Sequence, residues 1–140
     1  ININLAVSDK KKILKLYFRK KINMLNTTSK AIAKIHFKNG YKEKKIKSDT
    51  LNSILDKSNY KNKKIDFLNL DVEGNELNVL KSLNFKKYLP TLICVEIHNQ
   101  EEMYNRNKKY LKKNKVYKFL TKKKYKIIWN NDFSFILNKK

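Results

Sequence analysis

Two apolar segments of strand length, separated by a stretch with helical spacing, constrain the fold of this 140-residue chain more than any other feature. Residues 65–72 and 91–97 are largely apolar along their whole length, as is typical of buried parallel strands. Between them, four apolar residues recur with the spacing of one helix face. These residues are Leu77, Val79, Leu80 and Leu83. A strand, a helix and a second strand in this order predict an α/β fold.

The N-terminal third of the chain carries weaker signals. Residues 1–7 and 11–18 are expected to form two short strands around a polar turn, which indicates a hairpin. Residues 31–37 fit a strand and a helix equally well. A helix is expected to begin behind Asp49 or Thr50, because either residue can cap it.

The C-terminal third predicts helices followed by a hairpin. Asn99 and Glu102 have the spacing of a capping box and predict a helix start. A last helical turn or two is expected at residues 116–120, and an Asn-Asn-Asp turn joins expected strands at residues 125–129 and 133–137. We therefore expect one α/β domain over the whole chain, with a mostly parallel sheet that ends in an antiparallel hairpin.

The formal net charge of +22 is weaker evidence for a nucleic-acid partner than its size suggests. Arg19 and Arg106 are the only arginines, and the other basic residues are lysines spread over every segment. Lys, Asn and Ile have A/T-rich codons, so a nucleotide bias in the source genome explains the charge. Base readout depends on arginine forks, so we expect no specific nucleic-acid partner.

Composition excludes several other classes of protein. No apolar run approaches the ~18 residues of a membrane span and no signal-peptide pattern opens the chain, so we expect a cytoplasmic protein. The single cysteine, Cys94, excludes an intramolecular disulfide framework and a multi-cysteine zinc site. It lies within an apolar run and is expected to be a small core residue.

Acidic residues gather where the two central strands are expected to end. Residues 71–76 (DVEGNE) follow the first strand, and Glu96 and His98 stand at the end of the second. Ligands of open α/β sheets bind at the carboxyl ends of strands. If the strands are parallel neighbours, Asp71 and Glu73 come close to Glu96 and His98. Carboxylates and an imidazole at one site suit general-base catalysis or a divalent metal.

Each of these residues also has a structural interpretation. Asp71 and Glu73 could cap the next helix or pair with lysines. Glu76, in the first helical turn, suits the helix dipole better than catalysis. Glu96 must face solvent or have a partner, because an unpaired buried carboxylate is costly. His98 fits a site and a surface position equally well.

The central motif resembles the signature of the FkbM family of methyltransferases. In that family a hydrophobic strand ends in Lys-Ile-Asp-Val-Glu-Gly-x-Glu and is followed by a proline and by Glu-Ile-His. Here the motif is carried by residues 65–76, Leu80, Pro90 and residues 95–98. Asn69 and Leu70 stand where the family usually has lysine and isoleucine.

The flanking segments agree more weakly with the same family. Residues 4–9 are similar to its Asn-x-Ala-Val-Ser-Asp segment, and residues 131–135 resemble its closing strand. Residues 50–55 are similar to its Thr-Leu-Asp-x-Leu-Leu, with Asn52 in place of the usual aspartate.

The resemblance implies a Rossmann-like class I fold and methyl transfer from S-adenosylmethionine to an oxygen of a sugar, a glycan or a natural product. It makes Asp71 the first candidate for the base, or for orienting the acceptor, with Glu73 and His98 next. A divalent metal tying Asp71, Glu96 and His98 together is also compatible, although these positions have no diagnostic ligand spacing.

One feature of such enzymes is absent from the sequence. Class I methyltransferases hold their cofactor with a glycine-rich loop after the first strand, whereas this chain has only Gly40 and Gly74. The family places that loop before the segment resembled by residues 4–9, and the chain begins at Ile1 rather than at methionine. We therefore expect a partial FkbM-like domain without its N-terminal cofactor-binding part, whose 140 residues bind S-adenosylmethionine weakly or not at all.

Two other functions remain open at this stage. One is a catalytically inactive, methyltransferase-like interaction domain, in which Asp71 would be dispensable. The other is a basic nucleic-acid-binding module, whose affinity would fall steeply with salt.

Overall fold

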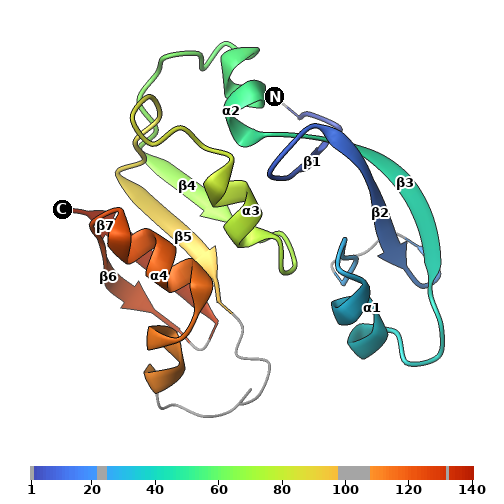
Figure 1. Cartoon of the computed structure of the whole chain (residues 1–140). Helices are drawn as coiled ribbons and strands as arrows, with labels where there is room; N and C mark the ends of the chain where they lie inside the picture. The colour runs from blue at the N-terminus through green and yellow to red at the C-terminus, as the bar shows by residue number, and fades with distance from the viewer. Residues whose placement is uncertain (1, 22–24, 98–107, 132) are drawn as a thin grey trace. The chain divides into compact units, whose positions relative to one another are not determined.

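The computed structural model describes residues 2–21, 25–97, 108–131 and 133–140, and it has the α/β composition that the sequence predicts (Figure 1). The chain forms two compact units. The first comprises Ile1–Asn62 and Val72–Asn84, and the second comprises Lys63–Asp71 and Phe85–Lys140. Within the described ranges, no helix has both the length and the apolar character needed to cross a bilayer.

The first unit is built on a three-stranded sheet of order β1-β3-β2, formed by Ala6–Val7, Lys42–Asp49 and Lys12–Phe18. Strand β1 runs parallel to β3, and β2 runs antiparallel to β3 over its whole length. The predicted hairpin between residues 1–7 and 11–18 is therefore wrong. Seven residues of β2 find partners on the eight-residue β3, whereas the two residues of β1 add only a short ladder on its other edge.

Three short helices complete the first unit: α1 (Lys30–His36), α2 (Leu51–Asp56) and α3 (Glu76–Lys81). The ambiguous segment 31–37 is therefore helical. Helix α2 is capped by Thr50, whose hydroxyl accepts a hydrogen bond from the Ser53 amide at 3.0 Å.

A small core forms where α1 covers one end of the sheet. It consists of Tyr17, Ala33 and Phe37, with Tyr41 packed edge-on against Tyr17. This core fixes α1 and the connection before it against β2.

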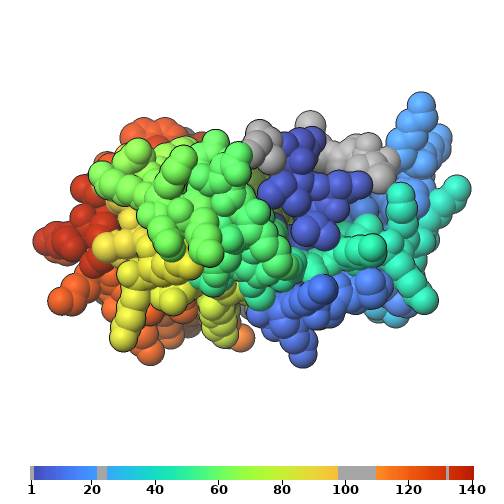
Figure 2. Space-filling view, turned by 90° about the horizontal axis from the view of Figure 1, so that it is seen from above, coloured from blue at the N-terminus to red at the C-terminus, as the bar shows by residue number. Residues whose placement is uncertain are grey.

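Asp49, at the end of β3, organises the start of α2. Its carboxylate accepts hydrogen bonds from Lys57 Nζ, the Thr50 amide and the Ser53 hydroxyl at 2.8–3.0 Å. The bond from Lys57 and then the Thr50 amide hold the pKa of Asp49 below its usual value. The N-terminal residues lie beside this region in both views (Figures 1 and 2), where Ile3 and Leu5 line a hollow of about 300 Å³ with Asp49.

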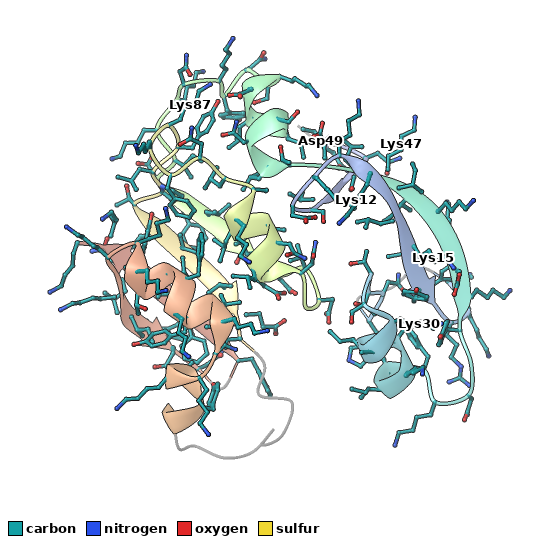
Figure 3. All side chains as sticks on the ribbon, viewed as in Figure 1. Lys12, Lys15, Lys30, Lys47, Asp49 and Lys87 are labelled. Atoms are coloured by element: carbon teal, nitrogen blue, oxygen red, sulfur yellow. The ribbon has the colours of Figure 1, made fainter. Side chains whose placement is uncertain are left out.

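Lysine side chains project into solvent from β2 and β3 (Figure 3). Lys15 lies directly opposite Lys45 across the ladder, and its Nζ pairs with Glu43 at 2.7 Å. That contact raises the pKa of Lys15. Such exposed pairs contribute little to stability, so the fold does not depend on this charge.

The second unit contains a four-stranded sheet of order β4-β5-β7-β6. Its strands are Phe67–Leu70, Leu92–Glu96, Ser134–Lys139 and Tyr125–Asn130, in that order. Strands β4 and β5 are parallel neighbours, as predicted. The antiparallel hairpin of β6 and β7 is also confirmed. Because β7 inserts antiparallel beside β5, the sheet has one parallel and two antiparallel ladders and is mixed rather than mostly parallel.

Strand β4 is shorter and more exposed than its apolar sequence predicts. It lies at the edge of the four-stranded sheet, and Phe67 is 52% exposed. A strand at a sheet edge is not enclosed on both sides, which explains why apolarity alone overestimated its burial.

The face of this sheet opposite to the Phe67 side chain packs into the main core of the second unit. Fully buried members include Ile93, Val95, Leu120, Tyr125, Phe135 and Leu137. Leu120 comes from helix α4 (Lys115–Lys122), capped by Asn114, which follows a 3₁₀ helix, η1 (Lys108–Lys112). Cys94 is half-buried on β5 rather than a core residue, since side chains alternate between the two faces of a strand. The helix predicted to start at Asn99 lies outside the described residues.

Candidate active site

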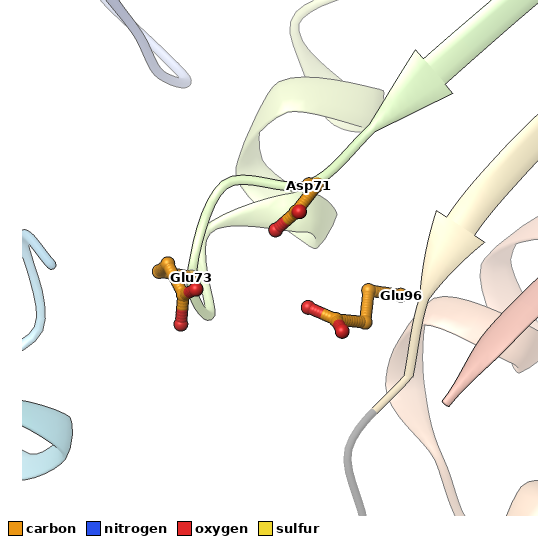
Figure 4. A group of neighbouring side chains, drawn as sticks. All are labelled: Asp71, Glu73 and Glu96. Atoms are coloured by element: carbon orange, nitrogen blue, oxygen red, sulfur yellow. The ribbon is translucent and has the colours of Figure 1, made fainter. Parts of the chain in front are cut away.

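The register of β4 and β5 brings two carboxylates to one end of the sheet. Asn69 pairs with Cys94, and Asp71 and Glu96 each follow two residues later in the chain. Asp71 comes directly after the end of β4, and Glu96 is the last residue of β5. Because side chains alternate along a strand, Asp71 and Glu96 extend from the same face at the carboxyl ends of neighbouring parallel strands (Figure 4). This is the position at which open α/β sheets bind ligands.

The carboxylates of this sheet end are close enough to act together. Asp71 and Glu96, which both belong to the second unit, each offer one carboxylate oxygen, and these two oxygens lie within 4.8 Å of one another. Glu73 is only two residues beyond Asp71, so the chain itself keeps its backbone within roughly 7 Å of that residue. Asp71 is exposed and Glu96 half-buried, so a ligand from solvent can reach the pair. Oxygens so arranged can accept protons from a hydroxyl or bind a hard cation such as Mg²⁺.

The thiol of Cys94 is affected by both strand-end carboxylates. Burial raises the pKa of its thiol, and the charges of Asp71 and Glu96 raise it further. The thiol therefore stays protonated at neutral pH, and Cys94 is not a nucleophile at this site.

The turn that carries Glu73 has an unusual backbone. Glu73 has a φ of 50° and Gly74 a φ of 91°, so two consecutive residues are left-handed. Glycine adopts this region freely, whereas a glutamate does not. Residues held in such conformations cluster at functional sites, where the surrounding structure maintains them.

Glu76 stabilises the same turn from within. Its side chain is only 6% exposed, and its Oε1 accepts hydrogen bonds from the amides of Gly74 at 3.0 Å and Val72 at 3.3 Å. Glu76 therefore has the structural role expected at a helix start, and its carboxylate is committed to the backbone.

Three segments of the first unit hold three consecutive residues of this turn. The Thr27 hydroxyl donates to the Glu73 carbonyl at 2.9 Å, and the Asn75 amide group donates to the Val7 carbonyl at 2.8 Å. Between them, Gly74 lies so close to Ile32 that an added Cβ would collide with Ile32 Cδ1. Because Ile32 Cδ1 is the flexible end of a side chain, the requirement for glycine at position 74 is chiefly conformational, set by its φ of 91°.

The sequence identified the acidic residues of this site but not their support. Asp71 and Glu96 lie at neighbouring strand ends, and Glu73 lies in the turn that follows Asp71, while their roles stay predictions. His98, the third member of the predicted Asp71–Glu96–His98 metal set, lies outside the described residues. Thr27 was missed, because nothing in a polar loop indicates a contact 46 residues away.

Comparison with known protein families identifies the family of this chain. The family model described as the methyltransferase FkbM domain matches residues 1–127. A search of curated proteins and a search of solved structures each found no match. The matched range covers most of the chain and includes both strand ends and the acidic turn. The chain belongs to the FkbM methyltransferase domain family.

Proposed function

We propose that this chain supplies the acceptor side of an S-adenosylmethionine-dependent methyltransferase that acts on a hydroxyl of a sugar, a glycan or a natural product. The observation that carries the proposal is the pair of carboxylates, Asp71 and Glu96, at the ends of neighbouring parallel strands. Membership of the FkbM family supports the reaction class.

The described residues include no glycine-rich loop of the kind that holds the cofactor in class I methyltransferases. The chain has two glycines, Gly40 and Gly74. Gly74 is packed against Ile32, and Gly40 lies exposed in a turn with nothing within 4 Å of an added Cβ. Neither offers the close backbone approach that a glycine-rich loop provides. The proposed roles of Asp71, Glu96 and Glu73 therefore concern the acceptor alone.

Asp71 is proposed as the general base. An alcohol must lose its proton as its oxygen forms the new bond to carbon, and a positioned base contributes roughly 10²–10⁴-fold to such a step. Asp71 is exposed at the strand end, so its carboxylate can approach a bound hydroxyl directly. Glu96, half-buried beside it, would orient the same hydroxyl or a neighbouring one.

Glu73 and a divalent cation are proposed as further contributors. The Asp71 and Glu96 oxygens, within 4.8 Å of one another, suit a hard cation, which would orient the acceptor and lower the pKa of its hydroxyl. Glu73 is a further acidic candidate from its place two residues after Asp71 in the sequence. His98 is kept as a candidate ligand or base from its place in the sequence.

The test uses the complete product of the open reading frame that encodes this chain. Transfer of a tritium-labelled methyl group from S-adenosylmethionine is measured with a panel of monosaccharides, oligosaccharides and hydroxylated natural products. Asp71→Asn is expected to lower kcat at least 100-fold. The matched control is Asp66→Asn, because Asp66 lies just before the same strand, is 81% exposed and contacts Lys64. Transfer that is equal in wild type and Asp71→Asn would refute the assignment of the base.

A further inference from the structure

The connection between β2 and α1 contacts the acidic turn more closely than its polar sequence suggests. Thr27 is 1% exposed, and its hydroxyl makes two hydrogen bonds. It donates to the Glu73 carbonyl at 2.9 Å and accepts from the Ser29 amide at 3.0 Å. A threonine hydroxyl with both a donor and an acceptor role has a fixed orientation.

Thr27 is itself anchored to the sheet. Its amide and carbonyl both bond to the backbone of Tyr17, at 3.3 Å and 2.8 Å, and form an isolated antiparallel bridge. Tyr17 is a core residue, packed with Ala33 and Phe37. The hydroxyl that reaches Glu73 therefore projects from a rigid part of the first unit.

Ile32 supports the next residue of the turn. It lies on α1, and its Cδ1 occupies the space that a Cβ of Gly74 would need. Helix α1 is held in place by Ala33 and Phe37, which belong to the same small core as Tyr17. Thr27 and Ile32 thus connect the core of Tyr17, Ala33 and Phe37 to Glu73 and Gly74, two consecutive residues with left-handed φ.

We propose that Thr27, assisted by Ile32, is a positioning residue that holds Glu73 in its left-handed conformation and so fixes the direction in which the Glu73 carboxylate projects from the turn. This inference rests on the proposed function of the acidic turn. Neither residue touches the reacting atoms. Without the Thr27 hydroxyl the turn loses one of its external supports, and the left-handed φ of Glu73 becomes less favoured than a relaxed alternative.

The composition of the chain provides a direct probe of this turn. Gly40 and Gly74 are the only glycines among these 140 residues, so in a ¹⁵N-glycine-labelled sample of the complete gene product they give the two backbone amide signals that report on this part of the protein. The Gly74 amide donates to Glu76 Oε1 within the turn, whereas Gly40 lies in a separate turn of the same unit and donates to the Phe37 carbonyl. Gly40 also has a left-handed φ, 93°, and therefore serves as an internal control.

The experiment compares Thr27→Val, which keeps the shape and removes the hydroxyl, with Thr27→Ser, which keeps the hydroxyl. In Thr27→Val the Gly74 signal is expected to shift, and its hydrogen exchange to become about tenfold faster, while Gly40 is unchanged. Thr27→Ser is expected to resemble wild type at both glycines. An unchanged Gly74 signal in folded Thr27→Val would overturn the proposal.

A second pair of variants covers the case in which Thr27→Val does not fold. Ile32→Ala removes the contact with Gly74, and Ile35→Ala is its control, because Ile35 is on the same helix and is 59% exposed. Only Ile32→Ala is expected to move the Gly74 signal. Equal spectra for the two variants would count against the support from α1.

The catalytic consequence is measured separately in the complete gene product. Thr27→Val is expected to lower kcat for methyl transfer about tenfold with little change in KM, and Thr27→Ser to restore it. A kcat equal to wild type in Thr27→Val, with Gly74 displaced, would refute the positioning role while leaving the proposed function intact. Absence of transfer in wild type would refute the proposed function, whereas the Gly74 signals still decide whether Thr27 holds the turn.

Discussion

Removal of the Glu76 carboxylate is expected to destabilise the acidic turn and the unit that contains it. This side chain is 6% exposed and accepts amide hydrogen bonds from Gly74 at 3.0 Å and Val72 at 3.3 Å. A hydrogen bond to a charged group contributes about 1.5–3 kcal/mol, and the longer of the two is weaker. Glu76→Ala should therefore lower the free energy of unfolding by about 2–4 kcal/mol.

A conservative variant separates the hydrogen bonds from the charge. Both amides donate to the same oxygen, Oε1, so the carbonyl of a glutamine can replace it. Glu76→Gln exchanges charged hydrogen bonds for neutral ones, which contribute about 0.5–1.5 kcal/mol each. We expect it to lose about half as much stability as Glu76→Ala.

The assay is urea denaturation followed by circular dichroism, together with the Gly74 amide signal as a local reporter. Glu43→Gln is the control, because Glu43 forms a solvent-exposed ion pair with Lys15 and its removal should cost under about 1 kcal/mol. A loss for Glu76→Ala no greater than that of the control would show that the turn does not depend on this carboxylate. A loss for Glu76→Gln equal to that for Glu76→Ala would show that charge, rather than hydrogen bonding, holds the turn.

Two further predictions concern the dependence of stability on pH. The pKa of Asp49 is lowered, chiefly by Lys57, so this carboxylate stabilises the fold above its unfolded-state pKa and loses that effect as the pH falls through its folded-state pKa. Asp49→Asn should lower the urea midpoint at pH 7, and its difference from wild type should shrink below about pH 4; an equal difference at both pH values would contradict this. Burial raises the pKa of Tyr125 to about 12, so the folded state keeps a phenolic proton that the unfolded chain loses near pH 10. Wild type should therefore lose stability from pH 10 to 12 more steeply than Tyr125→Phe in the same assay, and parallel losses would show that Tyr125 titrates normally.

The parts of the fold that the sequence predicted correctly depend on local signals. The parallel pair β4 and β5 and the final hairpin follow from apolar runs, turn residues and periodicity, each read within a few positions. The position of Asp71 and Glu96 at neighbouring strand ends follows from the same signals, because strand ends are local features and parallel neighbours end at the same edge.

The parts that the sequence did not predict depend on distant partners. Strand β1 pairs with β3, more than 40 positions away, although β2 is its neighbour in the chain. The apolar pattern shows that such segments are strands but not which edge each will join. The contact of Thr27 with Glu73 is of the same kind, because a hydroxyl can bond to any carbonyl that the fold brings to it.

The backbone at Glu73 connects these distant contacts to chemistry. A turn that served only to join β4 to α3 would be more stable with glycine or asparagine at a φ of 50°, since these residues adopt the left-handed region at little cost. The chain instead has glutamate there and supports it with Glu76 from within the turn and Thr27 from the first unit. A glutamate with this φ makes the fold less stable than a glycine would. Proteins retain such a cost in stability chiefly where the side chain is needed for function, as in catalytic sites. The left-handed φ of Glu73 and its supports from Glu76 and Thr27 therefore favour the proposal that an acidic group is needed at this position.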